Sequence, residues 1–175
     1  MSFLTRLFGR DRPRETMAPL YRAIVGHARD PRWYSQGGVP DTQDGRFDMI
    51  AAIISLVLIR LEAEGEAHAS ESALLTELFI DDMDSQLRQI GIGDVIVGKH
   101  IGKMMSALGG RMAAYREGFA PGGDPREALE RNLYRGEAPG DAAHAFSITR
   151  LERFAADLKA ATAGAVLTGA LPALT

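Results

Sequence analysis

Residues 49–59 read MIAAIISLVLI, a run in which no side chain carries a charge. A helix built from this run is apolar on every side, so it offers no polar face to water. Such a helix belongs in the centre of a protein, and the run is far shorter than the ~20 residues that a membrane-spanning helix needs. We therefore predict a core helix over residues 45–64, with Asp44 as its N-terminal cap and Gly65 at its exit.

Apolar residues at helical spacing flank this segment in both directions. No stretch shows the alternation of apolar and polar side chains between turns that is typical of a β-strand. The predicted fold class is therefore all-α, a single compact helical domain of about six helices with no sheet. The remaining helices are predicted at residues 16–29, 70–89, 97–119, 125–134 and from 141 onward.

The predicted helical domain spans residues 16–160, between a flexible basic and apolar N-terminal segment (1–15) and a frayed C-terminal tail (161–175). Three glycines interrupt the helix at 97–119, namely Gly102, Gly109 and Gly110. Each costs about 1 kcal/mol relative to alanine in a helix interior. Close packing against another helix would explain them.

Composition narrows the classes of function. The chain has 175 residues, 46% of them hydrophobic, which is enough for one good core. Its formal net charge of −3 and pI near 5.8 give no broad basic surface, so we do not expect a nucleic-acid partner. Without cysteine the chain has no disulfide, no thiol nucleophile and no thiolate metal ligand.

The acidic stretch from Asp81 to Asp84 could supply oxygen ligands to a hard cation. A calcium loop starting at Asp82 would place Leu87 where glycine is required and Gly93 where a bidentate glutamate is required. The histidines form no His-x-x-x-His pair, and no serine lies in a Gly-x-Ser-x-Gly turn. We therefore expect no metal site, no cofactor and no enzymatic activity. The rival, a divalent-metal enzyme using the aspartate-rich loops, predicts saturable metal binding that Asp82→Asn abolishes.

Residues 33–48, WYSQGGVPDTQDGRFD, hold more aromatic and charged side chains than a chain reversal needs, and we call them the signature segment. Six residues of this segment and three residues from later helices form our candidate partner-binding set: Trp33, Tyr34, Asp41, Thr42, Arg46, Asp48, Asp82, Arg88 and Lys99. The alternative is that the signature segment holds two helices together. Arg46 and Asp48 are too close in sequence to meet on a straight helix, so each should find another partner, whereas Asp84 and Arg88 suit an i,i+4 pair.

Two ordered blocks of sequence carry a family resemblance. The first runs from Trp33-Tyr34 to Met49-Ile50, and the second is Asp81-Asp82-Met83-Asp84-Ser85-Gln86-Leu87-Arg88, followed by Gly91-Ile92-Gly93-Asp94, Val97-Gly98-Lys99, Gly110-Arg111 and Tyr115. Over residues 20–119 the chain resembles the ubiquinol-cytochrome c chaperone family. It departs from the family pattern at Leu108-Gly109, and it matches little after Phe119.

The resemblance implies a non-enzymatic assembly chaperone for the ubiquinol-cytochrome c reductase, complex III of the respiratory chain. The client implied is newly made cytochrome b, the membrane-embedded haem subunit of that complex. A general helical adaptor at the inner membrane is the alternative function, and it predicts normal complex III in a deletion strain.

The first residues of the chain suggest a location. Apolar and arginine side chains alternate there in a pattern suited to peripheral contact with an anionic membrane surface: Phe3, Leu4, Leu7 and Phe8 beside Arg6, Arg10, Arg12 and Arg14. The apolar stretch is too short for a secretory signal. We therefore expect a cytoplasmic protein with peripheral contact at the inner membrane.

Overall fold

The computed structural model describes residues 11–89 and 97–175, and all of their regular structure is helical. The elements are α2 (Asp11–Ala28), α3 (Arg32–Ser35), α4 (Gln43–Glu62), η1 (Gly65–His68), α5 (Ala69–Gln89), α6 (Val97–Gly118), α7 (Pro125–Asn132), α8 (Asp141–Ala160) and α9 (Ala163–Leu167). The all-α prediction is confirmed. Each of the six helices expected from the sequence is present, and α3, η1 and α9 are short additions to them. No described helix combines the length and apolarity needed to cross a bilayer.

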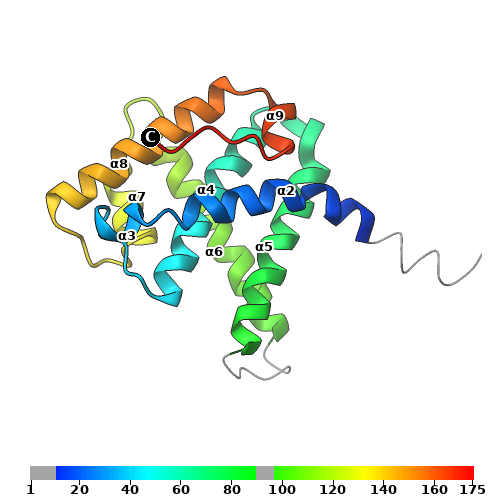
Figure 1. The fold of residues 1–175 in the computed structure, drawn as a ribbon, viewed down its shortest axis with the longest axis horizontal. Helices are drawn as coiled ribbons and strands as arrows, with labels where there is room; N and C mark the ends of the chain where they lie inside the picture. The colour runs from blue at the N-terminus through cyan, green and yellow to red at the C-terminus, as the bar shows by residue number, and fades with distance from the viewer. Residues whose placement is uncertain (1–10, 90–96) are drawn as a thin grey trace, which may run out of the picture.

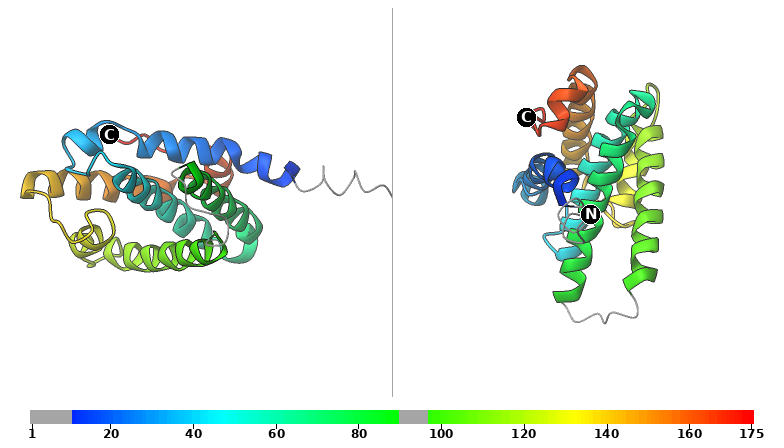
Figure 2. Two further views of the ribbon diagram at one scale, coloured as in Figure 1. Left: turned by 90° about the horizontal axis from the view of Figure 1, so that it is seen from below. Right: turned by 90° about the vertical axis from the view of Figure 1, so that its right-hand side faces the viewer.

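Helix α4 is the centre of the fold. Its side chains from Asp48 to Leu58 are all buried, as the uncharged run predicts, and it contacts α2, α5, α6, α8 and α9. Figures 1 and 2 show α2 and α6 on opposite sides of α4, and α5 and α6 side by side in opposite directions. Burying one large apolar side chain contributes roughly 1.5–3 kcal/mol, so the contacts of α4 supply much of the stability.

The start of α4 differs from the prediction that Asp44 caps it. The helix begins at Gln43, and the Thr42 hydroxyl accepts the hydrogen bond from the Gly45 amide at 3.1 Å. Asp44 therefore lies within the first turn. Glycine is required at position 45, because a Cβ there would lie 2.0 Å from the Pro40 carbonyl oxygen. The backbone at Pro40 therefore passes close to the first turn of α4, so the signature segment folds back onto the helix that follows it.

The glycines of α6 do not mark close helix packing, so that prediction was wrong. Gly102, Gly109 and Gly110 are exposed, and a Cβ added at any of them would meet no atom within 4 Å. Helix α6 packs instead through another face, which includes the buried side chains of Leu108 and Tyr115. Spacing shows that glycines share a face, but not whether that face meets a neighbour.

The ends of the chain also differ from expectation. Residues 1–10 lie outside the described residues, whereas the helix that includes 11–15 begins five residues before the predicted start. At the other end, Val166 and Leu174 are buried rather than frayed. The Leu174 carbonyl accepts hydrogen bonds from Arg32 at 3.1 Å and Arg150 at 2.7 Å, and these bonds fasten the tail.

Deleting residues 171–175 should lower the free energy of unfolding by about 3 kcal/mol, because it exposes the site of Leu174 and leaves the buried Arg150 without its carbonyl acceptor. Urea unfolding followed by circular dichroism measures the change. Deleting the exposed Thr175 alone is the control and should have little effect. Equal stability of the two truncated chains would mean that the tail contributes nothing.

Candidate functional site

The two aromatic residues that open the signature segment are structural. Trp33 is fully buried, and its indole N–H donates to the His27 carbonyl oxygen at 2.9 Å. The half-buried Tyr34 donates its hydroxyl to the Ala28 carbonyl, also at 2.9 Å. Both acceptors belong to the last turn of α2, where backbone carbonyls have no partner within the helix. Trp33 and Tyr34 thus end α2 and set the direction of the next segment.

Arg150 of α8 joins the signature segment to the end of the chain. Its guanidinium lies 4.6 Å from the Trp33 ring centroid and 5.4 Å from that of Phe146, and it donates to Asp30 at 2.6 Å. Hydrogen bonds from Arg32, and then from Arg150, hold the pKa of the Asp30 carboxyl well below its usual range. The result is a buried cation with a charged partner and two aromatic faces.

Asp48 is the most enclosed carboxylate among the described residues. Its side chain is fully buried, with one oxygen 2.6 Å from Arg111 of α6 and the other 2.5 Å from Arg135, just beyond α7. Arg135 also reaches Asp44 at 2.6 Å. The exposed Arg46 pairs with Asp41 at 2.8 Å. The prediction that Arg46 and Asp48 each find another partner is confirmed.

The remaining members of the candidate set are scattered. Thr42 is the cap of α4, and Asp82 on α5 accepts the Tyr21 hydroxyl at 2.7 Å. The side chains of Arg88 and Lys99, and with them the Asp84–Arg88 pair, lie outside what the structure describes. The contacts that the structure describes for these residues are all with other residues of this chain. Partner binding by these nine residues stays a prediction.

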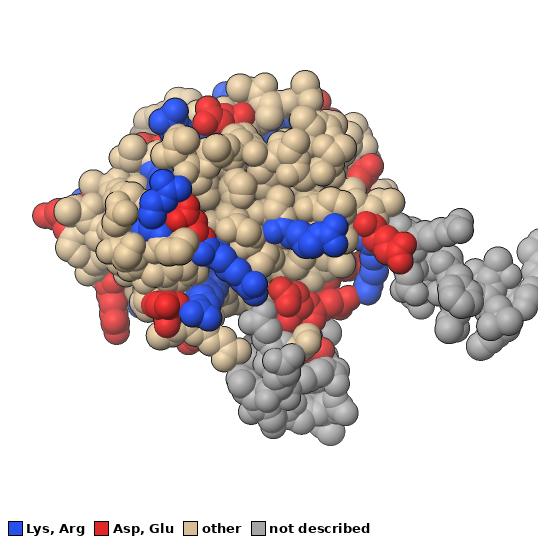
Figure 3. Space-filling view, in the orientation of Figure 1, with Lys and Arg blue, Asp and Glu red and all other residues tan. Residues whose placement is uncertain are grey.

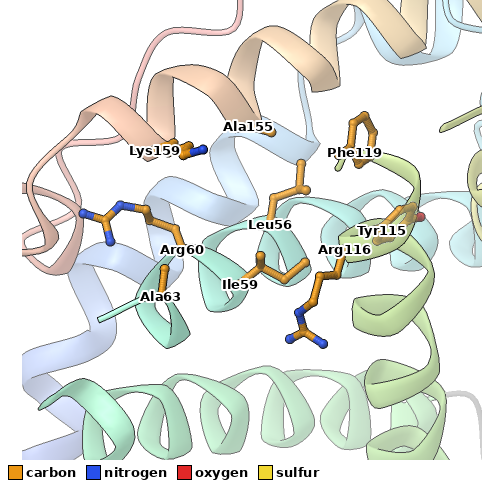
Figure 4. A pocket seen from close by; sticks show the side chains of 9 residues that line it. All are labelled: Leu56, Ile59, Arg60, Ala63, Tyr115, Arg116, Phe119, Ala155 and Lys159. Atoms are coloured by element: carbon orange, nitrogen blue, oxygen red, sulfur yellow. The ribbon is translucent and has the colours of Figure 1, made fainter. Parts of the chain in front are cut away.

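A small apolar cleft lies where α4, α6 and α8 meet (Figure 4). Its volume is about 240 Å³. Apolar side chains form most of the lining, and three cations stand around it: Leu56, Ile59, Ala63, Tyr115, Phe119 and Ala155, with Arg60, Arg116 and Lys159. Ligand pockets for drug-sized molecules usually measure about 300–1,000 Å³, so this cleft is suited to one or two side chains of a partner.

Two of the three cations around the cleft are already neutralised. Arg60 donates to the carbonyls of Leu158 and Ala161 at 2.9 and 2.8 Å and pairs with Glu64 at 2.9 Å. Arg116 pairs with Glu62. Lys159 makes no ion pair with any described residue. The cleft therefore presents an apolar floor and one uncompensated positive charge.

Sequence reasoning missed this cleft because its lining comes from three helices that are far apart in the chain. It also missed a polar stripe on α8, where His144, Ser147 and Arg150 are buried although periodicity singled out only apolar residues. Ala145, an apolar residue of the same helix, is exposed. The residues that the structure describes contain no cluster of three or more histidine and carboxylate side chains placed to hold a metal ion.

The protein is thus a helical domain with an apolar cleft of side-chain size. The family model described as ubiquinol-cytochrome C chaperone matches residues 35–169, so the chain belongs to the ubiquinol-cytochrome c chaperone family. A solved structure similar to the chain is the Cbp3 homolog from Brucella abortus, with 27% sequence identity and a TM-score of 0.80 over 97% of this chain and 95% of that one. No curated protein matches.

These comparisons confirm the resemblance carried by the two sequence blocks, and they assign the chain to chaperones of complex III assembly. They also correct its extent. The family match continues to residue 169, whereas the sequence analysis finds little resemblance to the family after Phe119. Helices α7 and α8 therefore fall within the family match, and α8 supplies both Arg150 and part of the cleft.

Asp48→Asn should lower the free energy of unfolding by about 3 kcal/mol, because it leaves two guanidinium groups without their buried carboxylate. Asp41→Asn removes an exposed pair, so it should change the free energy by less than about 1 kcal/mol. Denaturant titration of the two variants compares them directly. Similar losses in both would show that burial of the Asp48 carboxylate has no special weight.

Asp30 should make stability sensitive to acid. Its pKa is depressed in the folded chain, so its ionised form stabilises the fold above the unfolded pKa of about 3.9, and that contribution is lost as the pH falls through the folded pKa. Asp30→Asn should be less stable than the wild type at pH 7 and should lose less stability between pH 5 and pH 2. Parallel stability curves for the two proteins would contradict this.

Proposed function

We propose that this protein is a non-catalytic chaperone that holds newly made cytochrome b during assembly of complex III, and that the cleft between α4, α6 and α8 receives an apolar side chain of that client. The cleft is the observation that carries the proposal. It offers an apolar surface of side-chain size on a helical scaffold whose family consists of ubiquinol-cytochrome c chaperones.

Cytochrome b is a membrane protein, so its helices present apolar side chains that need cover until they reach their final environment. Removing apolar surface from water contributes about 25 cal/mol per Å². A few buried side chains contribute most of the binding energy in most interfaces, so one anchoring side chain in the cleft can bind the client. Because the cleft is small, later assembly steps can release that client. Lys159 can attract a carboxylate beside that anchor.

We further infer that the protein acts at the cytoplasmic side of the inner membrane, as a peripheral protein, because its proposed client resides in that membrane. Separation of membrane and soluble fractions, in strains with and without the client gene, tests this location. Membrane association that does not change when cytochrome b is absent would point to a direct contact with lipid.

The experiment that tests the function is deletion of the gene in its host, with complementation by the intact chain. Membrane haem b spectra and electron transfer from quinol to cytochrome c are measured in each strain. Loss of both, restored by complementation, supports a role in complex III assembly. Normal values in the deletion strain would favour a general helical adaptor at the inner membrane.

Ala155→Phe tests the cleft itself. The larger side chain would occupy much of the cleft, so affinity capture of cytochrome b from host membranes should fall about tenfold, and electron transfer in the complemented strain should fall with it. Ala145→Phe is the matched control, since it places the same side chain on an exposed position of the same helix.

Both variants should give the circular dichroism spectrum of the wild type. If Ala155→Phe captures as much cytochrome b as Ala145→Phe, the client does not use this cleft.

A further inference from the structure

A second hollow lies between α2 and α5, apart from the cleft, with a volume of about 660 Å³. Figure 3 shows basic and acidic side chains next to each other on the face that carries these two helices. The lining combines charged groups with half-buried apolar ones: Tyr21, Arg22, Val25, Gly26, Arg29, Leu78, Asp81, Asp82 and Ser85. We call this hollow the α2–α5 groove.

The two walls of the groove differ in how far their charges are satisfied. On the α5 wall, Asp81 pairs with Arg14 at 2.6 Å and Asp82 accepts the Tyr21 hydroxyl at 2.7 Å. On the α2 wall, the side chains of Arg22 and Arg29 make no ion pair or hydrogen bond with any described residue. The groove thus has two uncompensated guanidinium groups along one side.

Gly26 lies between these arginines on the exposed face of α2. A Cβ there would meet nothing within 4 Å, so packing within the chain does not require a glycine. Glycine inside a helix costs about 1 kcal/mol relative to alanine. A bare backbone at this point lets another backbone approach α2 closely, as glycine does at helix crossings.

We propose that the α2–α5 groove docks an amphipathic helix of a partner protein, one that carries two carboxylates two turns apart. Arg22 and Arg29 are seven residues apart, which places them roughly 10.5 Å apart along the axis of α2. A docked helix with acidic residues at the same spacing meets both arginines, and its apolar side chains cover Val25 and Leu78. This interaction is separate from client binding in the cleft and does not depend on it.

An anionic membrane fits the groove less well than a helix does. The surface is hollow, and its α5 wall carries the carboxylates of Asp81 and Asp82, so a layer of lipid phosphates over the groove would lie against acidic side chains as well as against the arginines. A helix avoids that contact because it can turn its carboxylates towards the α2 wall alone. The partner is therefore a protein segment with one acidic edge.

The test uses two fluorescent helical peptides of equal composition. In the first, two glutamates lie seven residues apart beside a leucine stripe, and in the second the same glutamates lie on opposite faces. Anisotropy titration of the full chain should show about tenfold tighter binding of the first peptide. Arg22→Glu with Arg29→Glu should abolish that preference, and Gly26→Leu should weaken binding about tenfold with both arginines still present.

Arg131→Glu is the matched control, because it reverses the charge of an exposed arginine on α7 and should leave binding unchanged. Equal binding of the two peptides, or equal binding by the wild type and the double variant, would overturn the proposal. So would flotation with phosphatidylglycerol vesicles that the double variant loses, because it would assign the arginines to lipid.

Discussion

The carboxylate of Asp48, enclosed by Arg111 and Arg135, is the constraint on which the arrangement of the helices depends. It lies on the core helix α4, while its partners come from α6 and from the segment after α7, so one buried anion sets the position of three parts of the chain. A charge taken out of water is tolerated only where such partners compensate it. Alternative packings of α4 against α6 would leave charges unpaired, and this favours a single register for the walls of the cleft.

Much of the scaffold was predictable because the sequence of α4 alone indicates a buried helix. The uncharged run from Met49 to Ile59 requires burial on all sides, and the helices around it follow from apolar spacing. The sites were harder to predict, because they depend on which faces meet in space. Nothing in the sequence near Ala155 indicates that it faces Ile59 across a cleft. Periodicity also overlooks a buried arginine such as Arg150, whose place depends on a distant aspartate and an aromatic ring.

The signature segment, although rich in aromatic and charged residues, has a structural role in this protein. Trp33 and Tyr34 terminate α2, Thr42 caps α4, and Asp48 locks α4 to α6. Of the two interpretations left open from the sequence, these contacts favour the one in which the segment holds helices together. Its surplus of aromatic and charged side chains is accounted for by hydrogen bonds within the chain. The surfaces that we propose for partners lie elsewhere, in a cleft and a groove with few unusual residues.

The central place of α4 has a consequence for synthesis of the protein. Part of the surface of α4 is buried by α8 and α9, which leave the ribosome about a hundred residues after α4 does. Until then, one side of this central apolar helix has no neighbour, and such surfaces promote aggregation of nascent proteins. This member of a chaperone family thus passes, while it is being made, through the same exposed condition from which we propose that it protects its client.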